Sequence, residues 1–263
     1  MARVLWLGDV MDQVQNASSD AVFEVTNPAG SSPIVVVCEH ASAYMPPALN
    51  NLGLSGDVLT SHAAWDPGAL GVATGLSQRL DAALVASRIS RLVYDCNRPP
   101  GHPGAMPARS EVFDIPGNVD LSAAQRETRH DAYYLPFRNA VAQTLEAAKS
   151  PILVTMHSFT PIYHGQQREV EIGLLHDADT RLVDAMLSCA AAHTDHVVRR
   201  NEPYGPQDGV THTVAEHATP KGHPNVMLEV RNDLIATPAA QDRMAAQIAG
   251  WLTQAIAGAT WTA

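Results

Sequence analysis

The chain has 263 residues, of which 46% are hydrophobic, and its 27 acidic and 17 basic residues give a net charge of −10. This length and apolar content suit one large α/β domain over residues 1–263, and the acidic balance argues against nucleic acid or an anionic membrane as a partner. No apolar run is as long as a membrane span, and the N-terminus lacks the pattern of a signal peptide. Three widely spaced cysteines, Cys38, Cys96 and Cys189, favour reduced thiols. We therefore expect a cytoplasmic protein.

The first part of the chain alternates strand and helix patterns. Residues 23–25 alternate between apolar and polar side chains like an edge strand. Residues 34–39 begin with four β-branched apolar residues, which are typical of a strand buried on both faces. Residues 69–82 predict an amphipathic helix, for which Asp66 is a suitable N-cap. Residues 83–87 and 92–96 predict two more strands, and the stretch 99–118, rich in proline and glycine, predicts a long functional loop.

The remaining patterns complete an alternating fold. Ser122 and Gln125 have the spacing of a capping box and begin a helix to about residue 149, which Pro136 is expected to kink or divide. Residues 151–156, 169–175 and 225–231 predict strands, and residues 179–193 and 238–256 predict helices. Strands that alternate with helices predict a three-layer αβα domain with a mostly parallel, mixed central sheet.

Three of the predicted strands deliver histidine or glutamate to their carboxyl ends. Glu39 and His40 end the first, His157 follows the strand at 151–156, and Glu229 lies near the end of the last. Ligands of open α/β sheets bind beyond the carboxyl ends of the strands, so we expect these residues to share one site.

A catalytic zinc takes three protein ligands from histidine and carboxylate and leaves one position to water or substrate. His40 and His157 are the candidate imidazole ligands, and Asp66 and Glu39 are candidates for the third. Adjacent residues of a strand point to opposite faces, so Asp66 is preferred beside His40, with Glu39 as an alternative ligand or a partner of the ligands. Each histidine could instead be a hydrogen-bonded core residue, and Asp66 a helix cap.

Two further groups suit hydrolysis. Glu229, at the end of an apolar strand, is expected to have a raised pKa and to act as a general base, although a salt bridge to Arg231 is an alternative. Asn97 and Arg98 suit a carboxylate clamp, because a guanidinium binds carboxylate through two hydrogen bonds. A structural pairing of Arg98 with Asp95 is the alternative.

Five motifs, in this order between residues 34 and 236, resemble the N-formylglutamate amidohydrolase family. They are Cys38-Glu39-His40-Ala41-Ser42, Trp65-Asp66-Pro67-Gly68-Ala69, Tyr94-Asp95-Cys96-Asn97-Arg98-Pro99, Met156-His157-Ser158 and Leu228-Glu229-Val230-Arg231-Asn232-Asp233-Leu234-Ile235. That family is distantly similar to zinc carboxypeptidases and aminoacylase-type amidohydrolases. The resemblance implies their αβα fold with a mixed sheet and a single zinc ion.

Carried to this chain, the resemblance makes His40 and His157 metal ligands, Asn97 and Arg98 the clamp, and Glu229 the base. The related enzymes carry glutamate three residues after the first metal histidine. Here that position is Ala43, so the carboxylate ligand must come from elsewhere, and Asp66 is our choice.

The leading hypothesis is hydrolysis of the amide bond of a small N-acyl amino acid, above all an N-formyl amino acid such as N-formyl-L-glutamate. The resemblance implies zinc, with other divalent metals as alternatives, and a place in amino-acid catabolism such as histidine degradation. Arg98 would hold a substrate carboxylate, with Arg109, Arg168 or Arg231 for a second. His217 is a candidate oxyanion or proton-shuttle residue on a loop, or an exposed histidine.

Two alternative functions stay open. The first is a carboxypeptidase-like metallopeptidase that acts on short peptides, in which the clamp would bind a C-terminal carboxylate. The second is a non-catalytic binding domain that retains the fold.

Overall fold

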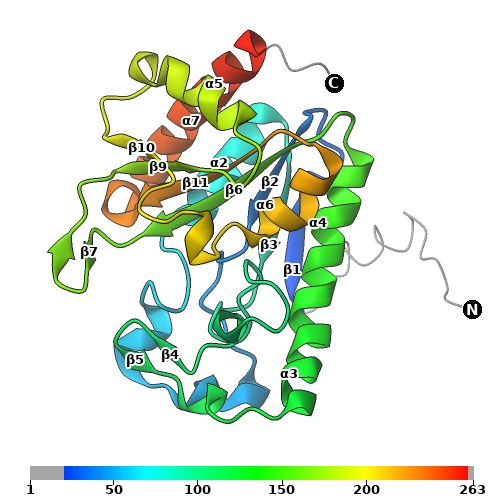
Figure 1. Ribbon diagram of the computed structural model, residues 1–263, viewed down its shortest axis with the longest axis vertical. Coiled ribbons are helices and arrows are strands. Elements are labelled where there is room, and N and C mark those ends of the chain that lie inside the picture. The colour runs from blue at the N-terminus through cyan, green and yellow to red at the C-terminus, as the bar shows by residue number, and fades with distance from the viewer. Residues whose placement is uncertain (1–20, 260–263) are drawn as a thin grey trace, which may run out of the picture.

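A computed structural model describes residues 21–259, in which a seven-stranded sheet has the order β1-β3-β2-β6-β11-β9-β10 (Figure 1). Its strands are β1 (Phe23–Thr26), β2 (Ile34–Cys38), β3 (Ala83–Ser87), β6 (Ile152–Phe159), β9 (Ile172–Leu175), β10 (Val198–Arg200) and β11 (Asn225–Arg231). Strands β3, β2, β6 and β11 are parallel, whereas β1 and β9 run antiparallel to β3 and β11. The predicted mixed, mostly parallel sheet is confirmed.

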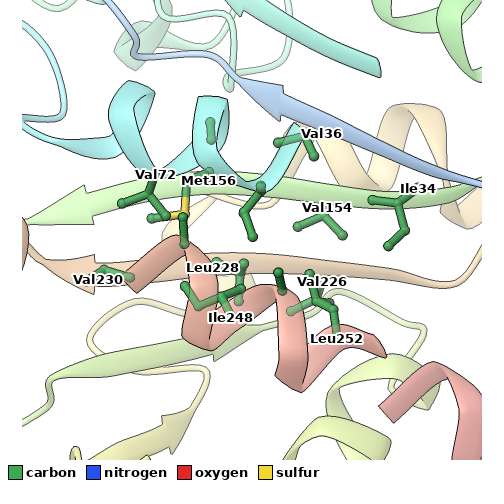
Figure 2. Packing of buried hydrophobic residues seen from close by; sticks show 14 of the residues in the cluster. Ile34, Val36, Val72, Val154, Met156, Val226, Leu228, Val230, Ile248 and Leu252 are labelled. Atoms are coloured by element: carbon green, nitrogen blue, oxygen red, sulfur yellow. The ribbon is translucent and has the colours of Figure 1, made fainter. Parts of the chain in front are cut away.

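Helices cover both faces of the sheet because its central strands are apolar on both sides. In β2, Val36 and Cys38 pack in one core cluster, while Val35 and Val37 pack in another. The first cluster includes α2 (Ala69–Leu80), α5 (Arg181–Cys189) and α7 (Pro238–Gly258); the second includes α4 (Leu135–Ala147) and α6 (His212–His217). Figure 2 shows Val36 and other strand residues facing the helices of the first cluster. The three predicted layers are confirmed.

The long helix predicted from residue 122 is divided, as expected. Ser122 and Gln125 form the capping box of α3 (Ala123–Arg129). A π-helical turn (His130–Tyr134) then leads into α4, which carries Pro136 in its first turn. Pro136 has no backbone N–H to donate, so it is tolerated where the regular helix begins again.

The strand predicted at residues 92–96 is wrong. These residues form a turn, in which the carbonyl of Leu92 accepts a hydrogen bond from the side chain of Asn118 and the N–H of Asp95 donates to Ala105. The apolar side chains of the segment are buried all the same, and this burial explains why the sequence resembles a strand. Its backbone groups are satisfied by the neighbouring loop instead of a ladder.

The connecting segments contain small elements. Two hairpins are formed by β4 (Arg109–Ser110) with β5 (Phe113–Asp114) and by β7 (Ile162–Tyr163) with β8 (Gln166–Gln167). Short 3-10 turns lie at Pro47–Gly53, Gly56–Thr60, Pro103–Ala105, Pro116–Asn118, Ala190–Ala192, Pro206–Asp208, Thr219–Lys221 and Asn232–Ile235.

Three expectations from the sequence concern membrane spans, a signal peptide and the number of domains. Among the described helices, none has both the length and the apolar character needed to cross a membrane. The expectation about a signal peptide concerns residues 1–20, which lie outside the described part. That residues 1–263 form one domain stays a prediction.

The strand order reverses between β2 and β6. From β2 the chain passes through α2 to β3 on one side, whereas β6 pairs with the other side of β2. Such a switch point opens a crevice at the carboxyl ends of the strands. His40 lies just beyond β2 and His157 lies inside β6, which is longer than predicted. The fold therefore brings both histidines to this crevice.

Gly173 in β9 leaves the space that the neighbouring strand and loop need. It pairs with Glu229 of β11, and a Cβ atom at this position would lie 2.1 Å from the carbonyl oxygen of Glu202. We expect Gly173→Ala to lower the free energy of unfolding by about 1–3 kcal/mol, because backbone has to move. Urea unfolding tests this, with Gly250→Ala as control, since a Cβ there meets nothing closer than 3.8 Å. Equal unfolding midpoints for both variants would contradict the prediction.

Candidate active site

Three predicted ligand atoms converge at the switch point. His157 Nδ1 lies 3.2 Å from His40 Nδ1 and 3.0 Å from Asp66 Oδ2, and His40 Nδ1 lies 3.3 Å from Asp66 Oδ2. All three side chains are buried. The carboxylate of Asp66 does not cap α2, whose N-cap is Gly68, so the capping alternative is wrong.

The spacing of these atoms fits a tetrahedral metal ion. Nitrogen and oxygen ligands about 2.0–2.1 Å from zinc stand about 3.3 Å from one another in a tetrahedron. The three measured separations, 3.0–3.3 Å, are close to that value. Two histidines and one carboxylate are also a donor set that zinc uses in catalytic sites. The residues therefore fit the metal that the family resemblance implies.

Each histidine has a carboxylate against its other ring nitrogen. Asp95 Oδ1 lies 2.7 Å from His40 Nε2, and Glu39 Oε2 lies 3.1 Å from His157 Nε2. A carboxylate at Nε2 favours the proton on that nitrogen, and the lone pair of Nδ1 is then free to bind a metal. Glu39 lies at ion-pair distance from His157 Nε2 without an aligned hydrogen bond, and it is outside the group of converging ligand atoms, which favours its role as a partner of a ligand over its alternative as a ligand.

The charges of the cluster also suit a divalent cation. The buried carboxylates of Glu39, Asp66 and Asp95 carry three negative charges, whereas Arg91 and the more distant Arg98 supply two positive charges. With both imidazoles neutral, one negative charge is left over. Buried charges are costly unless they are paired, so a dication would stabilise this cluster.

The pKa shifts of His40 and His157 also favour a bound cation at this cluster. Burial lowers the pKa of His157, yet the carboxylates of Glu39 and Asp66 outweigh burial and hold it well above its usual value. Burial and Arg91 likewise lower the pKa of His40, but Asp95 and Asp66 raise it on balance. Without a metal the imidazoles take up protons, and a bound cation would replace them.

Glu229 stands beside this cluster. It pairs with His157 in the parallel β11–β6 ladder, so both side chains leave the sheet on the same face. Burial raises the pKa of Glu229 to about 7, and within the described chain its Oε2 has no hydrogen-bond partner. The alternative of a salt bridge between Glu229 and Arg231 is wrong, because Arg231 pairs with Glu171 and Asp233. Glu229 thus has a free oxygen and a pKa suited to proton transfer.

A cavity of about 550 Å³ opens over these groups. Of the residues that the sequence proposed for the site, it is lined by His40, Asp66, Asn97, Arg98, His157, Arg168 and Glu229. Arg109, Arg231 and His217 do not line it. Arg109 pairs with Asp114 in the exposed β4–β5 hairpin, and His217 lies buried in α6, where burial lowers its pKa to about 4.

The predicted clamp is only partly free. The side-chain amide of Asn97 donates to the carbonyl of Val210 and accepts from the N–H of Thr213. Asn97 therefore fixes the start of α6 to the site. Arg98 donates to the carbonyl of Asp208 at 2.6 Å, and its Nε lies 3.9 Å from Asp95. Its guanidinium still lines the cavity, so Arg98 is the clamp residue that could contact an anion.

Sequence reasoning missed the roles of four residues at the cavity. Arg91 binds both Asp66 and Asp95, and His62 contacts Glu111 at 2.6 Å at the cavity wall. No local pattern marks Arg91 or Glu111. The role of Asp95 could have been found, because a metal-binding histidine usually needs a carboxylate or carbonyl at its second nitrogen.

Comparisons with known proteins identify the family of the chain. The family model of N-formylglutamate amidohydrolase matches residues 32–236. The chain belongs to the N-formylglutamate amidohydrolase family. The family name describes hydrolysis of the amide bond of N-formylglutamate, so the family implies a small-molecule substrate. A comparison with curated proteins found no match.

Solved structures also match this amidohydrolase. A gene product of Agrobacterium tumefaciens is 53% identical, with a TM-score of 0.87 over 90% of this chain and 95% of that one. An N-formylglutamate amidohydrolase from Ralstonia eutropha JMP134 is 16% identical, with a TM-score of 0.60 over 89% and 98% of the two chains, and shares the fold. A metallo-carboxypeptidase from Burkholderia cenocepacia matches at a TM-score of 0.38 and 9% identity, over 94% and 69%. That last likeness supports no conclusion about function.

Asp95 offers a test of the histidine–carboxylate arrangement in this amidohydrolase. We expect Asp95→Asn to weaken metal binding or activity by roughly 10- to 100-fold, because the ring of His40 loses the acceptor that orients it. Metal titration of the purified variant measures this effect. Asp242→Asn, which removes a surface carboxylate paired with Arg79, is the control. Metal affinity and activity unchanged in Asp95→Asn would contradict the assignment.

Proposed function

We propose that this member of the family is a metal-dependent hydrolase of N-acyl amino acids, in particular N-formyl amino acids such as N-formyl-L-glutamate. His40, Asp66 and His157 would hold one zinc ion, or another divalent cation. The observation that carries the proposal is the 3.0–3.3 Å spacing of their ligand atoms beside Glu229. Cytoplasmic location and a place in histidine degradation stay predictions from the sequence.

The bound cation would supply Lewis acidity, which polarises an amide carbonyl and makes water easier to deprotonate. Glu229 would take a proton from the attacking water and deliver it to the leaving amine nitrogen, so the carboxylate is regenerated at the end of the cycle. A pKa of about 7 allows both steps near neutral pH. Asp95 and Glu39 would hold the imidazoles in place, and Arg91 would hold Asp66 and Asp95.

Arg98 would bind a carboxylate of the substrate and so fix the amide relative to Glu229. Its side chain, 17% exposed, lines the cavity, and its guanidinium donates a hydrogen bond to the carbonyl of Asp208. Of the other arginines proposed from the sequence, Arg168 lines the cavity, whereas Arg109 and Arg231 do not, and we assign these two no contact with substrate.

A substrate panel on zinc-reconstituted protein tests the proposal. The panel contains N-formyl, N-acetyl and longer N-acyl derivatives of glutamate and of neutral amino acids, together with short peptides. We expect release of the free acid from N-formyl amino acids with the highest kcat/KM. Peptide turnover without deformylation would favour the carboxypeptidase-like alternative. No turnover of any compound by fully metal-loaded protein would overturn the proposal.

A further inference from the structure

The segment at residues 202–204 crosses the cavity face of the sheet beside Glu229. Gly173 of β9 pairs with Glu229 of β11, and a Cβ atom placed on Gly173 would lie 3.2 Å from the Cβ of Glu229 and 2.1 Å from the carbonyl oxygen of Glu202. The chain at Glu202 therefore packs on the same face of the sheet as the side chain of Glu229. Tyr204 lies two residues further on and lines the cavity together with Glu229. The absence of a side chain at Gly173 thus lets the chain bring a phenol to the wall beside the candidate base.

Two contacts hold the segment around Tyr204 in place. Arg168 lies against the ring of Tyr204, with its Cζ atom 4.8 Å from the ring centroid, a distance at which a cation is attracted to an aromatic ring. Further along the segment, the carbonyl of Asp208 accepts a hydrogen bond from Arg98 at 2.6 Å. The phenol is therefore positioned before any substrate binds. A donor that needs no rearrangement stabilises charge that develops during a reaction at the least cost.

The surroundings of Tyr204 keep the proton on its phenol. Burial, followed by the charge of Glu229, raises the pKa of Tyr204 to about 12, whereas Arg168 and Arg91 lower it. The hydroxyl therefore stays a hydrogen-bond donor over the range in which Glu229 titrates, since burial raises the pKa of Glu229 to about 7. Two titratable groups of one cavity with such different pKa values can take different roles. The carboxylate suits proton transfer, and the phenol suits hydrogen-bond donation.

Arg91 is less free for such a donation, although it also lines the cavity. Its guanidinium is shared between Asp66 Oδ1 at 3.2 Å and Asp95 Oδ2 at 2.9 Å. These two ion pairs direct its charge toward the metal-ligand group. Tyr204 therefore offers the cavity a neutral donor whose proton is not needed to hold that group together.

We propose that Tyr204 is a catalytic residue, whose hydroxyl donates a hydrogen bond to the amide oxygen of the substrate as that oxygen becomes negatively charged. This inference rests on the proposed function, but it concerns the attacked amide and not the amino acid that carries it. Attack of water on the carbonyl carbon moves the π electron pair of the C=O bond onto the oxygen, while Glu229 takes a proton from the water. The electron pair returns when the C–N bond breaks and Glu229 protonates the leaving nitrogen. Tyr204 keeps its own proton throughout.

Tyr204→Phe tests this role, because it removes one oxygen atom and keeps the ring that lies against Arg168. We expect kcat to fall by about 10²-fold, with KM and metal content nearly unchanged, since the hydrogen bond reaches its full strength only in the transition state. A purely structural role for the ring would leave kcat unaltered. Tyr44→Phe, which removes an exposed phenol that does not line this cavity, is the matched control. An unchanged kcat in Tyr204→Phe, or the same loss in both variants, would overturn the inference.

A binding measurement separates this inference from the proposed function. In a phosphoramidate analogue of the substrate, a tetrahedral phosphorus with charged oxygens replaces the acyl carbon. Calorimetry should show that Tyr204→Phe binds this analogue about 10²-fold more weakly than the wild-type enzyme does, while both bind the product L-glutamate equally well. Equal affinity of the two proteins for the analogue, or no binding by either, would overturn the role of Tyr204. Weaker binding of the analogue by Tyr204→Phe, with no hydrolysis of any N-acyl amino acid by the wild-type enzyme, would overturn the proposed function and leave the role of Tyr204 standing.

Discussion

Glu229→Gln is expected to reduce kcat by about 10²- to 10⁴-fold while the protein keeps its metal. The substitution nearly preserves shape, but an amide cannot accept the proton of the attacking water or return it to the leaving amine. The carboxylate lies beside His157 with a buried, unpartnered Oε2, and it lines the cavity, where a substrate amide would bind. Steady-state kinetics and metal analysis on the same sample measure the effect.

The pH profile adds a second readout of Glu229. Because the carboxylate is the active form, kcat/KM should fall as the pH drops below the pKa of Glu229, which burial raises to about 7. A bound cation would lower that value, so the acid limb is expected at or below about pH 7, and it should vanish in Glu229→Gln. Glu216→Gln, which removes a carboxylate of α6 that pairs with Arg138 of α4, is the control. Full activity in Glu229→Gln, or an unchanged acid limb, would contradict the role of Glu229 as base.

His157→Ala is expected to have the other large effect, on metal content. Removing one of three protein ligands should weaken metal binding by more than the roughly 10- to 100-fold expected for an outer partner such as Asp95. It also leaves the buried carboxylate of Glu39 without the imidazole at 3.1 Å, so some loss of stability is expected. Metal content after dialysis and kcat/KM are the measurements.

A second variant covers the case in which His157→Ala does not fold. Asp66→Asn keeps the shape of the third ligand and removes its charge, and it should also lose metal and activity. His193→Ala removes an imidazole that contacts Gln254 near α7, and serves as the control. Stoichiometric metal and full activity in both ligand variants would contradict the assignment of the metal site.

Much of this site could be predicted because its signals are local. A buried apolar strand that ends in a polar residue is visible in the sequence, and three such strands led to His40, His157 and Glu229. The choice of Asp66 over Glu39 followed from the alternation of side chains along a strand. In the structure, Asp66 lies with the histidines and Glu39 lies at the far nitrogen of His157.

The features that the sequence did not predict depend on contacts between segments that are distant in the chain. Residues 92–96 have the composition of a strand, but their backbone groups bond to Ala105 and Asn118 in the loop that follows, so local propensity was overridden. Arg231 is spaced to pair with Glu229 on β11, yet it meets Glu171 of the segment before β9. Which arginine reaches the cavity depends on the course of the β7–β8 hairpin, and the sequence contains no clear mark of that course.

The most direct test of the central claim is the dependence of amide hydrolysis on metal occupancy. Metal-free protein would be titrated with zinc while formate release from N-formyl-L-glutamate and bound metal per chain are both measured. A catalytic metal held by His40, Asp66 and His157 predicts activity that rises in proportion to occupancy and saturates at one ion per chain, and that a chelator removes. Formate release at the same rate from metal-free and metal-loaded protein would contradict it.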